Sequence, residues 1–295
     1  MRYRLPICNH DGRTPPTAAV AVLLTAVFSV AFCSGSPVQN TNQALSISWS
    51  NNLLTVTDGR LPGGQLEIWY LEAFCRSGAH DRDWTKTTLS HKTTLIRAEP
   101  TLLQFRTMVE PEIEVDHYVR ARSDELELGF ELRNKGNSFV DLQWFEPACI
   151  RVAAFTGCSQ SNYTSRSFIF TSKGLMKLDQ LQRTVNARYL GGQVYLPEFV
   201  RDKDANPRPI CLEHPVNGLI GCISPDNRWL LATASDRTHE LFEGVYVCLH
   251  SDPRVNGLAA GERKNFRSKI YLLPNDPSRL LERYQRDFPR LGSEW

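Results

Sequence analysis

The pattern of hydrophobic and polar residues predicts β-strands along most of the chain. Leu126, Leu128, Phe130 and Leu132 alternate with glutamates and a glycine, which is the period of a strand with one buried and one solvent-facing side. Comparable runs recur from residue 45 to residue 274, separated by residues that favour turns. We predict strands at residues 45–49, 53–56, 66–74, 93–98, 102–109, 113–120, 126–132, 140–144, 166–171, 174–178, 218–223, 229–234, 244–249 and 266–273.

One helix is predicted, near the C-terminus. Asp276 can cap it, Pro277 suits its first position, and Leu280, Tyr284 and Phe288 share one face. We expect this helix to close one end of the sheets. Many short strands, regular turns and a single helix predict an all-β fold, a large antiparallel β-sandwich with a short C-terminal helix.

The N-terminal segment has the three parts of a secretory signal peptide. Arginines precede an apolar run at residues 18–32, and small residues follow at 33–36. The run is short for a membrane span, which needs about 20 residues. We therefore predict a signal peptide at residues 1–35 and a single β-sandwich domain at residues 36–295, with an uncleaved anchor as the alternative.

The predicted signal sequence implies a secreted or periplasmic protein with no stable membrane span after signal removal. It also accounts for the net charge of +2. Residues 1–35 contain three arginines and one aspartate, so the rest of the chain has equal numbers of basic and acidic residues. A neutral domain lacks the basic surface that binds phosphate backbones. The sequence therefore argues against nucleic acid as a partner.

Six cysteines follow the predicted signal peptide, and their spacing leaves two alternatives open. An even number in an exported chain permits disulfides, whereas apolar neighbours favour buried thiols. No C-x-x-C motif occurs, and no spacing of His, Asp or Cys is typical of a metal site. Nucleotide-binding and G-x-S-x-G motifs are also absent from the sequence. We predict no metal and no cofactor.

Two segments resemble proteins of the galactose-mutarotase-like group. One is residues 126–137 followed by Val140 and Trp144, and the other is residues 257–263 followed by the predicted strand at 266–273. The resemblance implies a supersandwich-like fold with a sugar site on a concave surface, where a histidine acts as acid and a carboxylate as base. Residues 70–92, 206–209 and 249–253 are similar to exported bacterial proteins of unassigned function, which implies no activity.

A dense polar cluster follows the predicted strand at 66–74. A sugar site needs a flat apolar face for stacking and polar groups for hydroxyls, and this cluster supplies both. His80 and His91 are candidate catalytic residues. Candidate substrate-binding residues are Arg76, Asp83, Trp84 and Lys92. The alternative is a solvated loop with local salt bridges.

A second candidate group comes from the C-terminal half of the chain. His250 with Glu240 or Asp252 could transfer protons on a sugar, because an imidazole titrates near neutral pH. Asp252 could instead only form a turn with Pro253. Arg208, which lies between two prolines in an irregular segment, could bind a carboxylate in a bidentate manner, or form a loop salt bridge.

Together these features predict an exported carbohydrate-binding protein, with acid–base epimerisation or elimination as its candidate chemistry. The alternative is a noncatalytic adhesion or envelope-interaction module, since no decisive catalytic motif is present. Carbohydrate is the predicted partner. Under the first interpretation five side chains should converge in one cleft, and under the second they should scatter: His80, Asp83, Trp84, Arg208 and His250.

Overall fold

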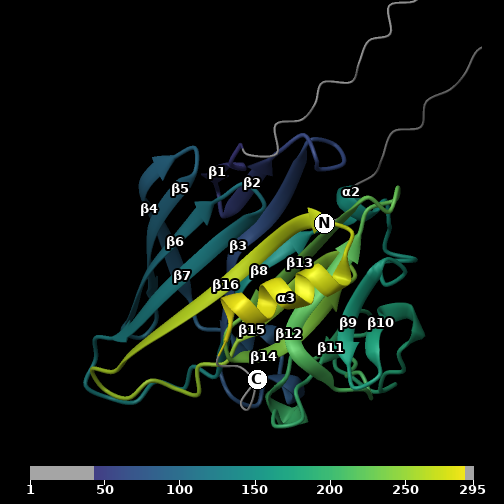
Figure 1. Cartoon of the computed structure of the whole chain (residues 1–295). Coiled ribbons are helices and arrows are strands. Elements are labelled where there is room, and N and C mark those ends of the chain that lie inside the picture. The colour runs from purple at the N-terminus through teal and green to yellow at the C-terminus, as the bar shows by residue number, and fades with distance from the viewer. Residues whose placement is uncertain (1–42, 290–295) are drawn as a thin grey trace, which may run out of the picture. The chain divides into compact units, whose positions relative to one another are not determined.

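Two antiparallel β-sheets face each other in the computed structural model, which describes residues 43–289 (Figure 1). This architecture confirms the predicted β-sandwich. The predicted signal peptide at residues 1–35 lies outside the described residues. No helix within residues 43–289 is long and apolar enough to cross a membrane.

The smaller sheet has seven strands and carries the candidate site. Its order is β1 (Ser46–Ser50), β2 (Leu53–Thr57), β3 (Gln65–Cys75), β8 (Trp144–Arg151), β15 (Cys248–Pro253), β14 (Thr238–Gly244) and β11 (Gln193–Tyr195). Strands far apart in the sequence are therefore neighbours at its centre, where β8 pairs with both β3 and β15.

The larger sheet has nine strands. Its order is β10 (Gly174–Lys177), β9 (Ser167–Thr171), β12 (Pro215–Ile223), β13 (Trp229–Ser235), β16 (Arg263–Pro274), β7 (Glu125–Asn134), β6 (Ile113–Ala121), β5 (Leu102–Val109) and β4 (His91–Glu99). The remaining elements are short: α1 (Trp84–Thr87), α2 (Ala153–Thr156), and the 3-10 turns η1 (Ala79–Asp81), η2 (Leu178–Gln180) and η3 (Asp202–Asp204).

The main core lies between the two sheets and follows the period-two pattern of the strands. On β7, Leu126, Leu128 and Leu132 are buried in this core, as their alternation with polar residues predicted. On β15, Leu249 belongs to the same core. Its neighbours along the strand consequently point to the other side of the seven-stranded sheet.

Two predicted strands are displaced in the structure. Val140 makes only an isolated bridge, and the strand predicted at 140–144 instead runs through Trp144–Arg151. Glu146 and Pro147 interrupt the apolar pattern of β8, so the pattern did not predict a strand there. The strand predicted at 244–249 is also wrong, because residues 245–247 form the turn between β14 and β15. Apolar residues in that turn mimic a strand pattern.

The C-terminal helix α3 (Pro277–Asp287) begins as predicted, because the Asp276 side chain accepts hydrogen bonds from two backbone amides of its first turn. It does not close one end of the sheets. Leu280, Tyr284 and Phe288 pack in a second apolar cluster with side chains of β9, β12, β13 and β16. The helix therefore covers part of the outer face of the nine-stranded sheet (Figure 1).

A buried ion-pair network holds the end of α3 against this sheet. Lys269 Nζ lies 2.8 Å from Glu125 Oε1 and 3.0 Å from Asp287 Oδ2. Arg283 also pairs with Glu125, at 2.6 Å. Because Lys269 and Glu125 are almost completely buried, the loss of one partner would leave a desolvated charge behind.

His117 is buried between the sheets in a structural role. Its Nδ1 lies 2.7 Å from the Tyr70 hydroxyl and its Nε2 lies 2.8 Å from Thr107 Oγ1. The ring stacks against Phe105 and Phe130. Burial lowers the pKa of His117 to about 3, so the folded protein holds this imidazole neutral.

We expect Lys269→Met to lower the free energy of unfolding by about 3 kcal/mol, since it removes one of the two cations that pair with both the Glu125 and the Asp287 carboxylates. Urea denaturation measures this change. The control is Arg97→Met, which breaks the exposed Arg97–Glu99 pair and should cost less than about 1 kcal/mol. Equal effects of the two substitutions would contradict the structural role of the network.

We expect the protein to lose stability as the pH falls from about 6.5 towards 3, in part because of His117. Below about 6.5 the unfolded chain binds a proton on this histidine that the folded state does not bind. His117→Gln should therefore flatten the pH dependence of the free energy of unfolding by up to about 1.4 kcal/mol per pH unit. Identical slopes for the two proteins between pH 4 and pH 6 would refute this assignment.

Candidate functional site

A cleft of about 350 Å³ lies on the outer face of the seven-stranded sheet. Its floor comes from the central strands β3, β8, β14 and β15, and its rim comes from α1, Tyr189, residues 206–208 and the turn at 245–246. Apart from Phe242, the side chains on the floor are carboxylates, thiols and an imidazole, whereas several of those at the rim are aromatic.

Strand alternation explains why these side chains face the cleft. Leu249 and Ile150 point into the core between the sheets, so Cys248, His250 and Cys149 point outward. A bulge in β3 adds Glu72 to this surface. The register against β8 shifts between Tyr70 and Ala73, and Leu71 within the bulge has a positive φ of 49°.

Asp204 joins the segments that cover this face of the sheet. Its backbone carbonyl lies 3.1 Å from both Trp144 Nε1 and His239 Nε2. Its side-chain Oδ1 accepts a hydrogen bond of 2.9 Å from the backbone amide of Gly78. One buried residue therefore ties the loop after β3 and the irregular segment before β12 to the strands below.

Aromatic side chains line the rim of the cleft. Tyr246 is 73% exposed, while Trp84 packs on Trp144. The Arg208 guanidinium lies over the ring of Tyr189, 5.0 Å from its centroid. The Nη1 atom of Arg208 also donates to the carbonyl of Leu190 at 3.2 Å. This arginine is thus held in one orientation beside an aromatic ring.

Carboxylates gather under and around the floor with little compensating positive charge. Glu146, Glu240 and Asp252 are buried, and Glu240 and Asp252 are opposite each other on β14 and β15. Burial and then the carboxylate of Glu72 raise the pKa of Glu146 well above its usual value. Burial raises the pKa of Asp252 to about 8. Desolvation therefore favours the protonated form of these acids.

His250 lies among these carboxylates. Its Nε2 is 3.8 Å from Glu72 Oε2, and its Nδ1 is 3.8 Å from Asp252 Oδ1. Burial by itself would lower the pKa of His250, but the contact with Cys248 and the nearby carboxylates raise it well above its usual value. The environment consequently favours positive charge at this position.

The structure places three of the sequence-predicted site residues on the cleft: Trp84, Arg208 and His250. Glu240 and Asp252 are fully buried on the same face of the sheet. Asp252 is part of strand β15, so the alternative that it only forms a turn with Pro253 is wrong.

Two other predicted residues lie beside the cleft lining. Asp83 forms an ion pair with Arg188, and the Tyr189 hydroxyl donates to the same carboxylate. His80 Nδ1 is 3.1 Å from the carbonyl oxygen of Asn206, which places its ring against the segment that forms the rim. Both residues therefore have contacts that position the rim.

The remaining predicted residues do not line the cleft. His91 and Lys92 begin β4 in the nine-stranded sheet. His91 Nε2 lies 3.1 Å from the carbonyl oxygen of Leu71, and its ring packs edge-on against Phe74. Arg76 is exposed just after β3. The polar cluster that is continuous in the sequence is divided because the chain crosses from one sheet to the other.

Sequence reasoning missed several residues of the cleft, among them Glu72, Glu146, Cys149, Tyr189 and Tyr246. One signal could have found the two glutamates. Each is a charged residue flanked by apolar residues within a strand segment, Tyr70–Cys75 for Glu72 and Trp144–Ile150 for Glu146, and a buried charge of this kind needs a specific reason. The aromatic residues lie in loops and carry no comparable signal.

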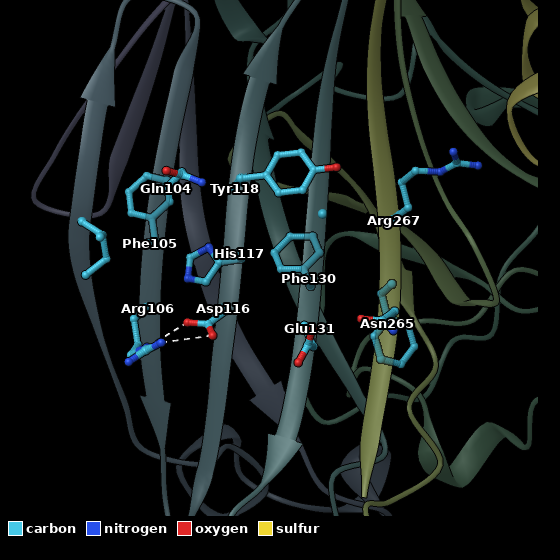
Figure 2. Close-up of a pocket in the computed structure, with 13 residues that line it drawn as sticks. Gln104, Phe105, Arg106, Asp116, His117, Tyr118, Phe130, Glu131, Asn265 and Arg267 are labelled. Atoms are coloured by element: carbon cyan, nitrogen blue, oxygen red, sulfur yellow. Dashed lines mark hydrogen bonds and ion pairs between the residues drawn. The ribbon is translucent and has the colours of Figure 1, made fainter.

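A larger hollow, of about 600 Å³, lies on the nine-stranded sheet and is lined by side chains of β4–β7 and β16 (Figure 2). Arg106 pairs with Asp116 at 2.8 Å, and the Tyr118 hydroxyl donates to Glu127 at 2.6 Å. The Tyr118 ring covers Gly129 so closely that a Cβ there would clash. Because these polar groups already satisfy one another, we favour the smaller cleft as the site of chemistry.

Several solved structures that are similar to this chain are described as galactose mutarotase-like proteins or putative aldose 1-epimerases. A putative aldose 1-epimerase from Escherichia coli K12 is 9% identical, with a TM-score of 0.42 over 78% of this chain and 99% of that protein. A galactose mutarotase-like protein from Lactobacillus casei is 9% identical, with a TM-score of 0.41 over 78% of this chain and 100% of that protein. A galactose mutarotase-like protein from Clostridium acetobutylicum is 7% identical, with a TM-score of 0.40 over 80% of this chain and 100% of that protein.

No protein-family model and no curated protein sequence matches the chain.

The described residues also contain two groups of side chains that could hold a metal ion. Cys149, Cys248 and His250 form one, and Glu72, Glu146 and His250 form the other. Within each group the potential ligand atoms all lie within 4.8 Å of one another. Both groups share His250 and lie on the floor of the cleft.

We expect Asp204→Ala to loosen both covering segments and leave the strands intact. The substitution removes the carboxylate that accepts from Gly78, and a hydrogen bond to a charged group contributes about 1.5–3 kcal/mol. Hydrogen exchange followed by mass spectrometry should show faster exchange in residues 76–88 and 200–208. Asp204→Asn, which keeps an acceptor oxygen, should have a smaller effect. Unchanged exchange in both segments would show that Asp204 does not anchor them.

Proposed function

We propose that the protein is exported and binds a carbohydrate in the cleft on the seven-stranded sheet, where acid–base side chains epimerise it or eliminate across one of its bonds. The observation that carries this proposal is that Trp84, Arg208 and His250 lie with two glutamates in a single cleft. These are three of the five side chains expected to converge; His80 and Asp83 lie beside the cleft and contact its rim. Under the alternative, a noncatalytic adhesion module, the five should scatter.

The cleft matches the two chemical surfaces of a sugar ring. The apolar face of a pyranose stacks on an aromatic side chain, and Tyr246 and Trp84 supply such surfaces at the rim. Sugar hydroxyls need closely placed acceptors and donors. Glu72, Glu146 and Asn206 supply these on the floor.

Arg208 extends this match to acidic sugars. Its guanidinium is positioned over Tyr189 at the edge of the cleft, and guanidinium groups bind carboxylates in a bidentate manner. A uronate bound through its carboxylate at Arg208 would place its ring above the floor. We therefore favour uronate-containing sugars over neutral ones.

The two glutamates on the floor can divide the proton transfer between them. Epimerisation and elimination both need one group that gives a proton and another that accepts one. Burial favours the protonated acid at Glu146, while Glu72 is only partly buried and faces the cleft. Because one carboxyl oxygen of each residue lies within 4.8 Å of the other and of a ring nitrogen of His250, the two carboxyl groups can reach the same sugar carbon.

Isothermal titration against neutral and uronate-containing mono- and oligosaccharides tests the binding step. We expect the wild-type protein to bind at least one uronate, and Tyr246→Ala to weaken that binding by about 5-fold or more, since stacking contributes about 1 kcal/mol or more. Phe139→Ala removes another exposed aromatic side chain, one that does not line the cleft, and should have no effect. Absence of binding to every sugar, with the fold intact, would refute the proposal.

A second measurement separates catalysis from binding. Glu146→Gln keeps the shape of the side chain but removes the transferable proton, so we expect turnover of the bound sugar to fall by about 100-fold or more while binding is retained. Nuclear magnetic resonance spectra of the sugar in D2O report epimerisation or elimination directly. Binding without turnover by the wild-type protein would instead support the noncatalytic alternative.

A further inference from the structure

We infer that Cys149, Cys248 and His250 bind a zinc ion on the floor of the cleft. Thiolates and imidazole are the ligands that zinc prefers, and two cysteines with one histidine form a known type of zinc site with one open position. The inference does not require that the cleft bind sugar.

The distances between the ligand atoms fit a tetrahedral ion. Cys248 Sγ lies 3.6 Å from His250 Nε2. Bond lengths of about 2.3 Å to sulfur and about 2.0–2.1 Å to nitrogen place such atoms roughly 3.6 Å apart around tetrahedral zinc. All three donor atoms lie within 4.8 Å of one another. An ion could therefore be bound with only small side-chain adjustments.

The backbone holds this arrangement in place. β15 pairs with β8, with Leu249 opposite Ile150, so His250 and Cys149 lie at adjacent positions of neighbouring strands. Cys248 is two residues before His250 and points to the same face. All three side chains are buried, and the sheet fixes their relative positions.

The second nitrogen of His250 supports the assignment. A histidine that binds metal through one ring nitrogen usually donates its other N–H to a carboxylate. His250 Nδ1 faces Asp252 Oδ1 at 3.8 Å, and the buried Nδ1 and both Asp252 side-chain oxygens make no hydrogen bond within residues 43–289. A metal on Nε2 would fix the proton on Nδ1, where Asp252 can accept it.

The charge of the surroundings favours a cation. Glu72, Glu146, Glu240 and Asp252 lie near His250, and Glu72, Glu240 and Asp252 each have a buried oxygen without a hydrogen bond among the described residues. Unpaired buried carboxylates are unfavourable. A divalent ion bound by two thiolates and an imidazole would leave one coordination position facing Glu72, whose Oε2 is 3.8 Å from His250 Nε2.

Metal content and the spectrum of the cobalt form test this inference directly. The full-length protein, kept under a reductant that does not bind metal, is incubated with Zn²⁺, desalted and analysed by mass spectrometry for metal and free thiols. We expect about one zinc per chain. Replacement by Co²⁺ should give intense visible bands of a tetrahedral ion and a thiolate-to-metal charge-transfer band. This spectrum needs no variant, so it does not depend on whether variants fold.

Three variants locate the ion. Cys149→Ser and Cys248→Ser should lose the charge-transfer band or reduce it by half, and bind zinc at least 100-fold more weakly. Asp252→Asn should weaken binding by about 10–100-fold, as expected for a residue that orients a ligand. The control is Cys158→Ser, which replaces a buried thiol beside Ser165 and should bind zinc like the wild type. Circular dichroism confirms that each variant folds.

Several results would overturn the inference. These are no retained zinc in the reduced wild-type protein, a cobalt spectrum without thiolate bands, zinc binding by either cysteine variant that equals that of the wild type, or a Cys149–Cys248 disulfide that forms in preference to the metal site. Failure of sugar binding alone leaves the zinc site unaffected, because metal content and the cobalt spectrum are measured without sugar. Conversely, a protein without zinc can still bind sugar through its aromatic rim.

Discussion

The seven-stranded sheet must satisfy charged side chains on the face that points away from the core, and the structure of the cleft depends on this constraint. Glu146, Glu240, His250 and Asp252 face away from the partner sheet, yet they are buried. A buried charge is tolerated only with hydrogen bonds or opposite charge nearby. The loop after β3 and the segment before β12 cover these side chains, and Asp204 anchors both segments to the sheet through its carbonyl and its carboxylate. The cleft lies beside these segments, on the part of the same face that they leave open.

The outer faces of the two sheets differ in how their polar side chains are covered or paired. On the nine-stranded sheet, α3 covers one part with apolar side chains and a buried ion-pair network. The other part is exposed, and its charged groups pair with each other across neighbouring strands, as Arg106 does with Asp116. Such exposed pairs contribute little to stability. Their charged groups are already occupied by each other. Within residues 43–289, most buried side-chain polar atoms without a hydrogen-bond partner lie on the seven-stranded sheet, so that is where binding and chemistry are proposed.

The strands and the sandwich could be predicted from the sequence because burial on one face imposes a period of two, as on β7. Prediction failed where that period was masked. β8 is buried on both faces and contains Glu146 and Pro147, so its pattern is neither alternating nor uniformly apolar. The site was predicted only in part for a related reason. Trp84, Arg208 and His250 converge through pairings of distant strands and loops, whereas His91 follows the chain into the other sheet. Trp84 and His91 are close in the sequence, but the local sequence does not show that only His91 continues into the nine-stranded sheet.

The bulge at Leu71 redirects Glu72 without changing the phase of β3 on either side of it. Before it, Ile68 and Tyr70 point into the core; after it, Phe74 points there while Ala73 and Cys75 face the covering segments. With strict alternation residue 72 would point into the core together with Tyr70 and Phe74, so the bulge is what presents Glu72 to the cleft. The length of this strand is therefore as constrained as its composition. Loss of a single residue at the bulge would exchange inside for outside over the rest of β3, so homologous chains that preserve the cleft should vary here by substitution rather than by insertion or deletion.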